Sequence, residues 1–269
     1  MPKGIWIISL EVIPLNLEPF IFDCEVFAYD WLFVFKNKVT GEYTEIWNDN
    51  EAVEQFMTQE PLLAGFNNKH YDQFILKAVL SGFTPEEIKA VNDFIIVGSH
   101  EGWEYAPLRD CGIFFDQYDL MDDCQMGLSL KAIEAHLGMD IRETTVPFNI
   151  DRPLTEDEKR EVEFYCRHDV DATDRLDDLR QGYLSSKLTL GREKGLYPAK
   201  ALYMTNAKLT AAYLDAEQKP HYDEREYQYP PKLLRQYIPQ EVFDFFERMK
   251  DKSIPDEVVF KEKLDLMVG

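Results

Sequence analysis

Runs of hydrophobic residues in the first half of the chain predict a series of β-strands. The runs are rich in aromatic and β-branched side chains and are separated by turn residues, as strands commonly are. The first is FIFDCEVFAYDWLFVF at residues 20–35, which contains the opening strand. The stretch DWLFVFKNKVTGEYTEIW at residues 30–47 predicts two strands around a turn at Thr40 and Gly41, so the opening strand is followed by antiparallel neighbours. Two later runs are PLLAGFN at residues 61–67 and GIFFDQYDL at residues 112–120.

Hydrophobic residues three or four positions apart predict helices between and after these strands. The predicted helices cover residues 50–57, 71–82, 129–138 and 155–179, and one more begins at Thr84. Those that begin at Thr84 and Thr155 open with the capping boxes TPEE and TEDE, and Gly138 is placed to end a third. Strands in a meander, followed by strands that alternate with helices, predict an α/β fold with a mixed central sheet flanked by helices.

Length and composition predict one large domain with an appendage. The 269 residues are 45% hydrophobic, which is enough to bury a sizeable core. We place the α/β domain at residues 1–182 and a mostly helical extension at residues 183–269, where prolines interrupt the pattern. The apolar stretch GIWIISLEVIPL at residues 4–15 is too short for a membrane span and lacks the flanks of a signal peptide. No membrane partner is therefore expected.

The cysteines predict a reducing compartment. The four of them are scattered along the chain without C-x-x-C spacing, at Cys24, Cys111, Cys124 and Cys166. Such a distribution argues for free thiols and a cytoplasmic setting, and against a disulfide framework or a zinc site.

Two carboxylates interrupt the first apolar run. Asp23 and Glu25 are two positions apart, so in a strand they point to the same face, opposite Cys24. Burying two like charges without a compensating cation is unfavourable. The pair therefore marks either a solvated acidic edge of the sheet or a metal site.

Two further acids and a tyrosine are placed to join this pair. Asp169 lies on the apolar stripe of the helix predicted over residues 155–179, and Tyr165 lies one turn before it. Asp72 follows the strand predicted at residues 61–67, at the kind of sheet edge where α/β proteins bind ligands. Hard divalent cations such as Mg²⁺ take carboxylate oxygens as ligands, and a pair of them supports phosphoryl displacement. We therefore expect a site for divalent cations where these segments meet.

The net charge of -21 argues against a nucleic-acid partner, because acidic proteins repel phosphate backbones. One segment, residues 182–214, differs from the rest. Against the single acid Glu193 it carries the basic residues Lys187, Arg192, Lys194, Lys200 and Lys208, with Tyr183, Tyr197 and Tyr203 between them. Cations interleaved with aromatic rings are typical of single-strand grooves. The segment is therefore either a solvated helical surface or a guide that brings a strand to the acids, with Arg192 and Lys194 on its phosphates.

Three motifs together resemble the DEDD family of 3′ to 5′ exonucleases. FDCEVF at residues 22–27 resembles the first motif, D-x-E, and NKHYD at residues 68–72 resembles the second. YCRHD at residues 165–169 resembles the third motif in its tyrosine form, Y-x-x-x-D. SLKAI at residues 129–133 resembles the Ser-Leu motif that contacts single-stranded substrate in the proofreading domains of family B and phage DNA polymerases. The resemblance covers residues 20–180.

The resemblance implies a ribonuclease H-like fold and removal of nucleotides from the 3′ end of single-stranded DNA with two Mg²⁺ or Mn²⁺ ions. It implies that Tyr165 orients the attacking water. The residues that it implies for holding the ions are Asp23, Glu25, Asp72 and Asp169. Those that it implies for contact with the strand are Asn68, Tyr71, Ser129 and Leu130.

The histidine form of the third motif fits less well. It requires an acid five positions after the histidine, and from His168 that position is Thr173. A lysine that some phage relatives carry before the third motif has only Arg152 as its counterpart. Three activities stay open: a DNA exonuclease that proofreads for a polymerase domain in the same or a partner chain, an RNA-trimming exonuclease, and a catalytically silent domain that binds strands.

Overall fold

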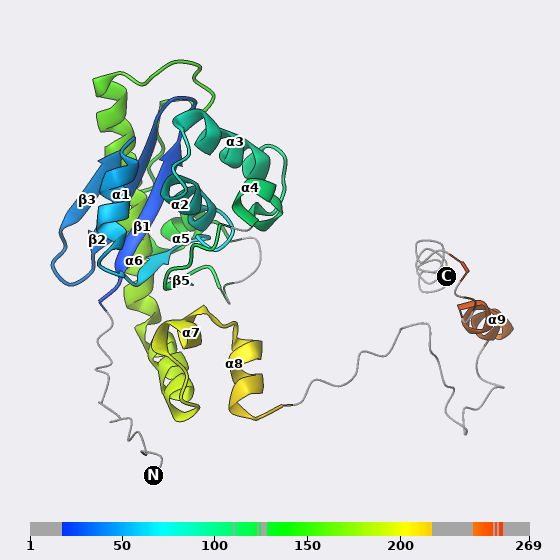
Figure 1. The fold of residues 1–269 in the computed structure, drawn as a ribbon. Helices are drawn as coiled ribbons and strands as arrows, with labels where there is room; N and C mark the ends of the chain where they lie inside the picture. Colours follow the sequence, from blue (N-terminus) through cyan, green and yellow to red (C-terminus); the bar gives the residue numbers. More distant parts are fainter. Residues whose placement is uncertain are drawn as a thin grey trace, which may run out of the picture. The chain divides into compact units, whose positions relative to one another are not determined.

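A computed structural model describes residues 18–109, 111–122, 124, 128–216, 239–249, 251 and 253–254 (Figure 1). The chain divides into two compact units, residues 1–216 and 217–269. The first unit contains a five-stranded mixed sheet with helices on both faces, which confirms the predicted α/β class. The described part of the second unit contains helix α9, Gln240–Met249. The apolar stretch at residues 4–15 and most of the second unit lie outside the described residues.

The sheet has the strand order β3-β2-β1-β4-β5. Its strands are β1 (Phe20–Val26), β2 (Trp31–Asn37), β3 (Tyr43–Trp47), β4 (Leu63–Gly65) and β5 (Gln117–Asp119). The first three strands form an antiparallel meander, whereas β4 and β5 run parallel to β1. Because β4 pairs only with Phe20 and Ile21, the later half of β1 pairs with β2 alone. Asp23 and Glu25 lie in this half, beside the loop and helix that follow β4.

Helices begin where the capping signals predict. Those of the first unit are α1 (Asn50–Met57), α2 (Asp72–Leu80), α3 (Pro85–Ile96), α4 (Ala106–Arg109), α5 (Leu130–Leu137), α6 (Glu156–Glu193), α7 (Pro198–Tyr203) and α8 (Asn206–Tyr213), with a 3₁₀ turn at Gly102–Glu104. Thr84 and Thr155 form the two predicted capping boxes. Ser129 caps α5 by accepting from the Ala132 amide at 3.2 Å. Gly138 ends α5 with a φ of 67°, a conformation that favours glycine.

The two faces of the sheet have separate cores. On one face, helices α1, α2 and α3 cover the sheet (Figure 1). Phe22 and Cys24 of β1 pack with side chains of these helices. On the other face, Ile21 packs with α6 through Val162 and Cys166. Because side chains alternate along a strand, the carboxylates at positions 23 and 25 share the α6 face. The prediction that the two acids and Cys24 point to opposite faces of the sheet is therefore confirmed.

Helix α6 is longer than the sequence pattern suggested. We expected it to end near Leu179, yet it continues to Glu193 and passes through the predicted domain boundary after residue 182. Its later half supports α7, because Gly191 lies so close to Ala201 that an added Cβ would be 2.4 Å from the Ala201 Cβ. The helix has 38 residues, but many are charged. Neither α6 nor another helix in the described ranges combines the length and apolar character of a membrane span.

The strands predicted at residues 61–67 and 112–120 are shorter in the structure. β4 and β5 each contain three residues. Phe114, inside the predicted fifth strand, is 89% exposed and lies outside β5. The apolar runs predicted strands that are too long, because an apolar residue extends a strand only where its backbone pairs with a neighbouring strand.

Candidate functional site

Carboxylates from three elements meet beside the later half of β1. Asp23 and Glu25 project from β1 toward α6. Asp72 is the first residue of α2, and Asp169 lies within α6. Glu25, Asp72 and Asp169 are 8%, 3% and 8% exposed. The structure thus brings together the four acids that the sequence singled out.

The electrostatics of the cluster show how strongly these carboxylates interact. Burial raises the pKa of Asp23 well above its usual value, and the charges of Asp72, Glu25 and Asp169 raise it further. Burial likewise raises the pKa of Glu25, with smaller contributions from Asp169 and Asp72. It raises the pKa of Asp72 to about 6. Such a cluster takes up protons unless cations compensate its charge.

Lys131 supplies one positive charge to the cluster. It lies on α5, within the SLKAI segment, and its Nζ forms an ion pair with Asp169. The same Nζ lies 3.5 Å from Glu134 Oε1 and 4.9 Å from the centre of the Tyr165 ring. Against the larger effect of burial, its charge lowers the pKa of Glu25. Sequence reasoning missed Lys131, although its place inside a motif assigned to strand contact was a signal.

Tyr165 lies on α6 one turn before Asp169, as predicted. Its side chain is partly buried, and burial together with the charges of Asp169 and Glu25 raises the pKa of its hydroxyl. The phenol therefore stays protonated and can donate a hydrogen bond at neutral pH. His168 on the same helix lies near Glu134 instead, with 4.0 Å between its Nε2 and Glu134 Oε1.

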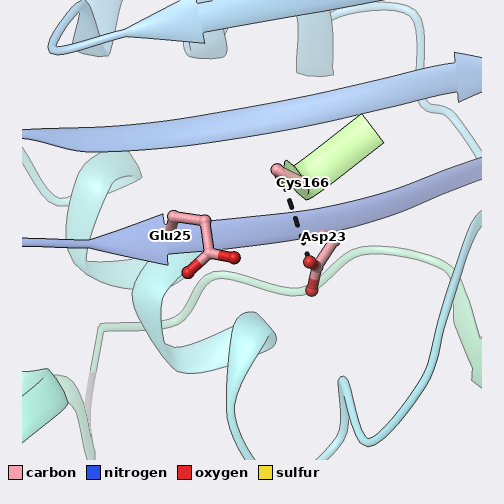
Figure 2. Close-up of side chains that lie close together, drawn as sticks. All are labelled: Asp23, Glu25 and Cys166. Atoms are coloured by element: carbon pink, nitrogen blue, oxygen red, sulfur yellow. Dashed lines mark hydrogen bonds between the residues drawn. The ribbon is translucent and has the colours of Figure 1, made fainter. Parts of the chain in front are cut away.

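Two buried thiols lie against the carboxylates. Cys24 Sγ donates to Asp72 Oδ1 at 3.1 Å. Cys166 Sγ donates to Asp23 Oδ2 at 3.7 Å (Figure 2). Burial raises the pKa of both thiols, and the neighbouring carboxylates raise it further. Sequence reasoning used the cysteines only to judge the compartment, and it missed that one lies inside D-x-E and the other next to Tyr165.

The residues implied for strand contact have partners within the protein. The Asn68 side chain is fully buried, and its amide contacts Gln117 Oε1 at 2.8 Å. The Tyr71 hydroxyl donates to Asn92 Oδ1 at 2.7 Å. Ser129 serves as the cap of α5, which places the partly buried Leu130 at the start of that helix, directly before the lysine of the cluster.

Part of the basic segment lies far from the acids. Arg192 and Lys194 are at the C-terminal end of α6, which is about 35 Å along the helix from Asp169 at ~1.5 Å per residue. Lys194 Nζ also forms an ion pair with Asp215 at 2.6 Å. Lys187 is buried and donates to Leu202 O at 2.8 Å. The expected proximity of Arg192 and Lys194 to the acids is therefore not found.

Another part of this segment lines a pocket of about 390 Å³ near α2. Tyr197, Lys200 and Tyr203 line it together with Gln73 and Lys77. Gln73 follows Asp72 directly in α2, so one short stretch of helix contributes to both the pocket and the acid cluster. The pocket offers cations beside aromatic rings, which is the combination expected of a single-strand surface.

The site as a whole combines carboxylates, a lysine, a tyrosine and two thiols on β1, α2, α5 and α6. Its interpretation depends on the chemistry of these groups. No family model, curated protein or solved structure matches this chain.

Proposed function

We propose that the chain is a metal-dependent 3′ to 5′ exonuclease that hydrolyses the terminal phosphodiester bond of single-stranded DNA in a ribonuclease H-like domain. The observation that carries this proposal is the meeting of four carboxylates in one largely buried cluster. The motif resemblance adds support, because D-x-E falls on β1, the second motif reaches the start of α2, and Y-x-x-x-D falls on α6.

The residues of the cluster fit hard divalent cations. Glu25 is 8% exposed, and among the described residues its carboxylate has no hydrogen bond and no ion pair. Within the part of the chain that the structure describes, the positive charge on these carboxylates comes from Lys131, which pairs with Asp169 and acts more weakly on Glu25. Carboxylate oxygens are the ligands that Mg²⁺ and Mn²⁺ prefer. The residues that would hold these cations are Asp23, Glu25, Asp72 and Asp169.

The bound cations would supply Lewis-acid activation of water and would neutralise charge on the leaving oxygen. Tyr165 would orient the attacking water, since its hydroxyl is protonated and lies one turn from Asp169. Lys131 would pair with a phosphate oxygen of the strand, because its side chain is 25% exposed at the border of the cluster.

We further propose that the domain proofreads for a phage-type DNA polymerase in the cytoplasm, with the polymerase domain in the same chain or a partner chain. The resemblance of SLKAI to the Ser-Leu motif supports this role, and α5 carries that segment to the acid cluster through Lys131. Tyr71 and Leu130 would contact the terminal nucleotides. The pocket lined by Tyr197, Lys200 and Tyr203 would receive the strand behind them.

The proposal is tested by digesting single-stranded DNA and RNA that carry a label at either end, with the full chain and Mg²⁺ or Mn²⁺. We expect 5′-labelled DNA to shorten one nucleotide at a time and a 3′ label to leave at once as a mononucleotide, with EDTA stopping both. Faster digestion of RNA would favour an RNA-trimming enzyme. Binding without digestion of either polymer would favour a silent strand-binding domain.

A further inference from the structure

The donor set beside β1 contains a sulfur atom that a purely oxygen-ligated site does not need. Asp23 and Glu25 come from β1 and Cys166 comes from α6, and one ligand atom from each lies within 4.8 Å of the others. Figure 2 shows the two carboxylates projecting from the same strand with the thiol of the helix beside them. Two oxygens and one sulfur thus surround a single point between a strand and a helix.

The distance between the sulfur and the nearest carboxylate oxygen suits a shared tetrahedral metal. Cys166 Sγ is 3.7 Å from Asp23 Oδ2. A tetrahedral zinc ion with Zn–S of ~2.3 Å and Zn–O of ~2.1 Å separates its sulfur and oxygen ligands by about 3.6 Å. The other thiol of the site differs, because Cys24 Sγ is 3.1 Å from Asp72 Oδ1 and lies on the opposite face of the sheet. Both thiols donate a hydrogen bond to a carboxylate, but of the two contacts only that of Cys166 has the spacing of two ligands of one tetrahedral metal.

A second observation, independent of the sulfur, also favours a cation at this position. Asp169 has Lys131 as its partner, Asp72 has the Cys24 thiol, and Asp23 has the Cys166 thiol. Glu25 is more than nine-tenths buried, and its carboxylate has no such partner among the described residues. The charge of Lys131 offsets only part of the cost of burying this carboxylate, so the position beside Glu25 favours a further positive charge.

We propose that Asp23, Glu25 and Cys166 form a site for a thiophilic divalent cation of the Zn²⁺ class. Binding forms a sulfur–metal bond and breaks the S–H bond, and the proton passes to solvent, so no oxidant or reductant is required. Three protein ligands leave one position free, as in zinc sites that accept a water or a substrate oxygen. The lack of C-x-x-C spacing argued against zinc in the sequence, but a mixed site assembled from a strand and a helix leaves no such spacing.

This site shares two carboxylates with the proposed Mg²⁺ or Mn²⁺ centre, so the cations compete. Sites with nitrogen, oxygen and sulfur donors bind Zn²⁺ more tightly than Mn²⁺, and thiolate ligands increase the preference. Micromolar Zn²⁺ should therefore displace millimolar Mg²⁺. The resulting inhibition of DNA digestion rests on the proposed function, whereas the binding of the thiophilic cation does not.

The test is a titration of the metal-free full chain with Cd²⁺, followed by the ultraviolet charge-transfer absorbance of a cadmium–thiolate bond. We expect the parent and Cys24→Ser to give one saturable band, and Cys166→Ser to lose it. Equilibrium dialysis should show Zn²⁺ affinity at least about tenfold weaker in Cys166→Ser and in Glu25→Gln than in the parent, since each lacks one of three protein ligands. Circular dichroism spectra identify any variant that fails to fold, in which case Cys166→Ala replaces Cys166→Ser.

A band that persists in folded Cys166→Ser, or that disappears in folded Cys24→Ser instead, would overturn the inference. The outcomes separate it from the proposed function. DNA digestion with Mg²⁺ but no cadmium–thiolate band in the parent would reject the thiophilic site alone. A band that depends on Cys166, in a chain that degrades neither DNA nor RNA, would reject the exonuclease alone.

Discussion

Lys131 on α5 forms an ion pair with Asp169 on α6, across 38 residues of sequence. The Asp169 side chain is 11% exposed, so solvent screens this pair only weakly. The pair lets the acid cluster form without a bound cation, because one lysine compensates one of its carboxylates. It also means that any cation bound at Asp169 competes with Lys131 for the same oxygens.

Replacing Lys131 by methionine should destabilise the metal-free protein by about 1–3 kcal/mol, because it leaves a largely buried carboxylate without its partner. Added Mn²⁺ should restore part of that loss by taking the place of the lysine charge. Urea unfolding in EDTA and in Mn²⁺ measures both effects. The matched control is Lys89→Met, which removes a surface pair with Asp93 and should cost about 0.5 kcal/mol or less. An equal loss of unfolding free energy in the two variants would show that Lys131 does not stabilise a buried carboxylate.

Asp72 should make the metal-free protein less stable as the pH rises. Its pKa is about 6 in the folded chain against a reference of 3.8, so the folded state binds the proton more tightly than the unfolded state. The stabilisation that the protonated Asp72 carboxyl gives the folded state is fully present below the unfolded pKa. It is lost as the pH rises through about 6. At ~1.36 kcal/mol per pKa unit, the loss is at most about 3 kcal/mol.

Asp72→Asn removes this titration and is the variant that measures it. In EDTA, its free energy of unfolding should exceed that of the parent near neutral pH, and the difference should shrink toward about pH 4 as the parental carboxyl becomes protonated. Urea unfolding at several pH values gives the comparison. A difference that grows toward acid pH would mean that Asp72 is stabilised as a carboxylate, contrary to its burial among acids.

Tyr165→Phe tests the role of the tyrosine hydroxyl. A group that orients water without holding a cation should matter less than a carboxylate ligand, so we expect kcat to fall by about 10- to 1000-fold while Mn²⁺ affinity stays unchanged. Single-turnover digestion and Mn²⁺ titration measure the two quantities. A variant as fast as the parent would leave Tyr165 as a packing residue of α6.

The predictable parts of this protein depend on local patterns. The three strands of the meander follow from runs of apolar residues, and the starts of α3 and α6 follow from capping boxes at Thr84 and Thr155. The four carboxylates were identified because they lie in three motifs that follow one another in the expected order. Side-chain alternation in a strand also placed Asp23 and Glu25 on one face. In each case a few neighbouring residues carried the signal.

The missed parts depend on docking between distant segments. Lys131 joins the site only because α5 places it against Asp169 of α6, and Cys166 joins it only because α6 packs against β1. The position of Arg192 was misjudged for a related reason. We expected the helix to end near Leu179, but α6 continues to Glu193 and carries Arg192 away from the acids. The sequence has no proline near Leu179 that would end the helix there.

Strand contact should depend on the pocket more than on the end of α6. Lys200→Glu should raise the apparent KM for long single strands and reduce its salt dependence, because Lys200 lines the pocket near α2. Arg192→Glu with Lys194→Glu should have a smaller effect, given their distance along the helix. Digestion of long strands over a range of salt concentrations gives both values, and turnover of a dinucleotide is the control. A larger effect for the double variant would locate the strand along α6 instead.

The central claim is that the four clustered carboxylates hold divalent cations that cleave DNA from its 3′ end. The most direct measurement is the single-turnover rate of 3′-nucleotide release in Mn²⁺ for the parent, Asp23→Asn and the control Asp157→Asn. Asp157 is a matched acid with a side chain that is 91% exposed at the start of α6. We predict that Asp23→Asn loses at least about 10²-fold in rate, yet is no less stable than the parent in EDTA because it relieves repulsion, and that Asp157→Asn keeps the parental rate. Release at the parental rate by Asp23→Asn, or release that persists in EDTA, would contradict the claim.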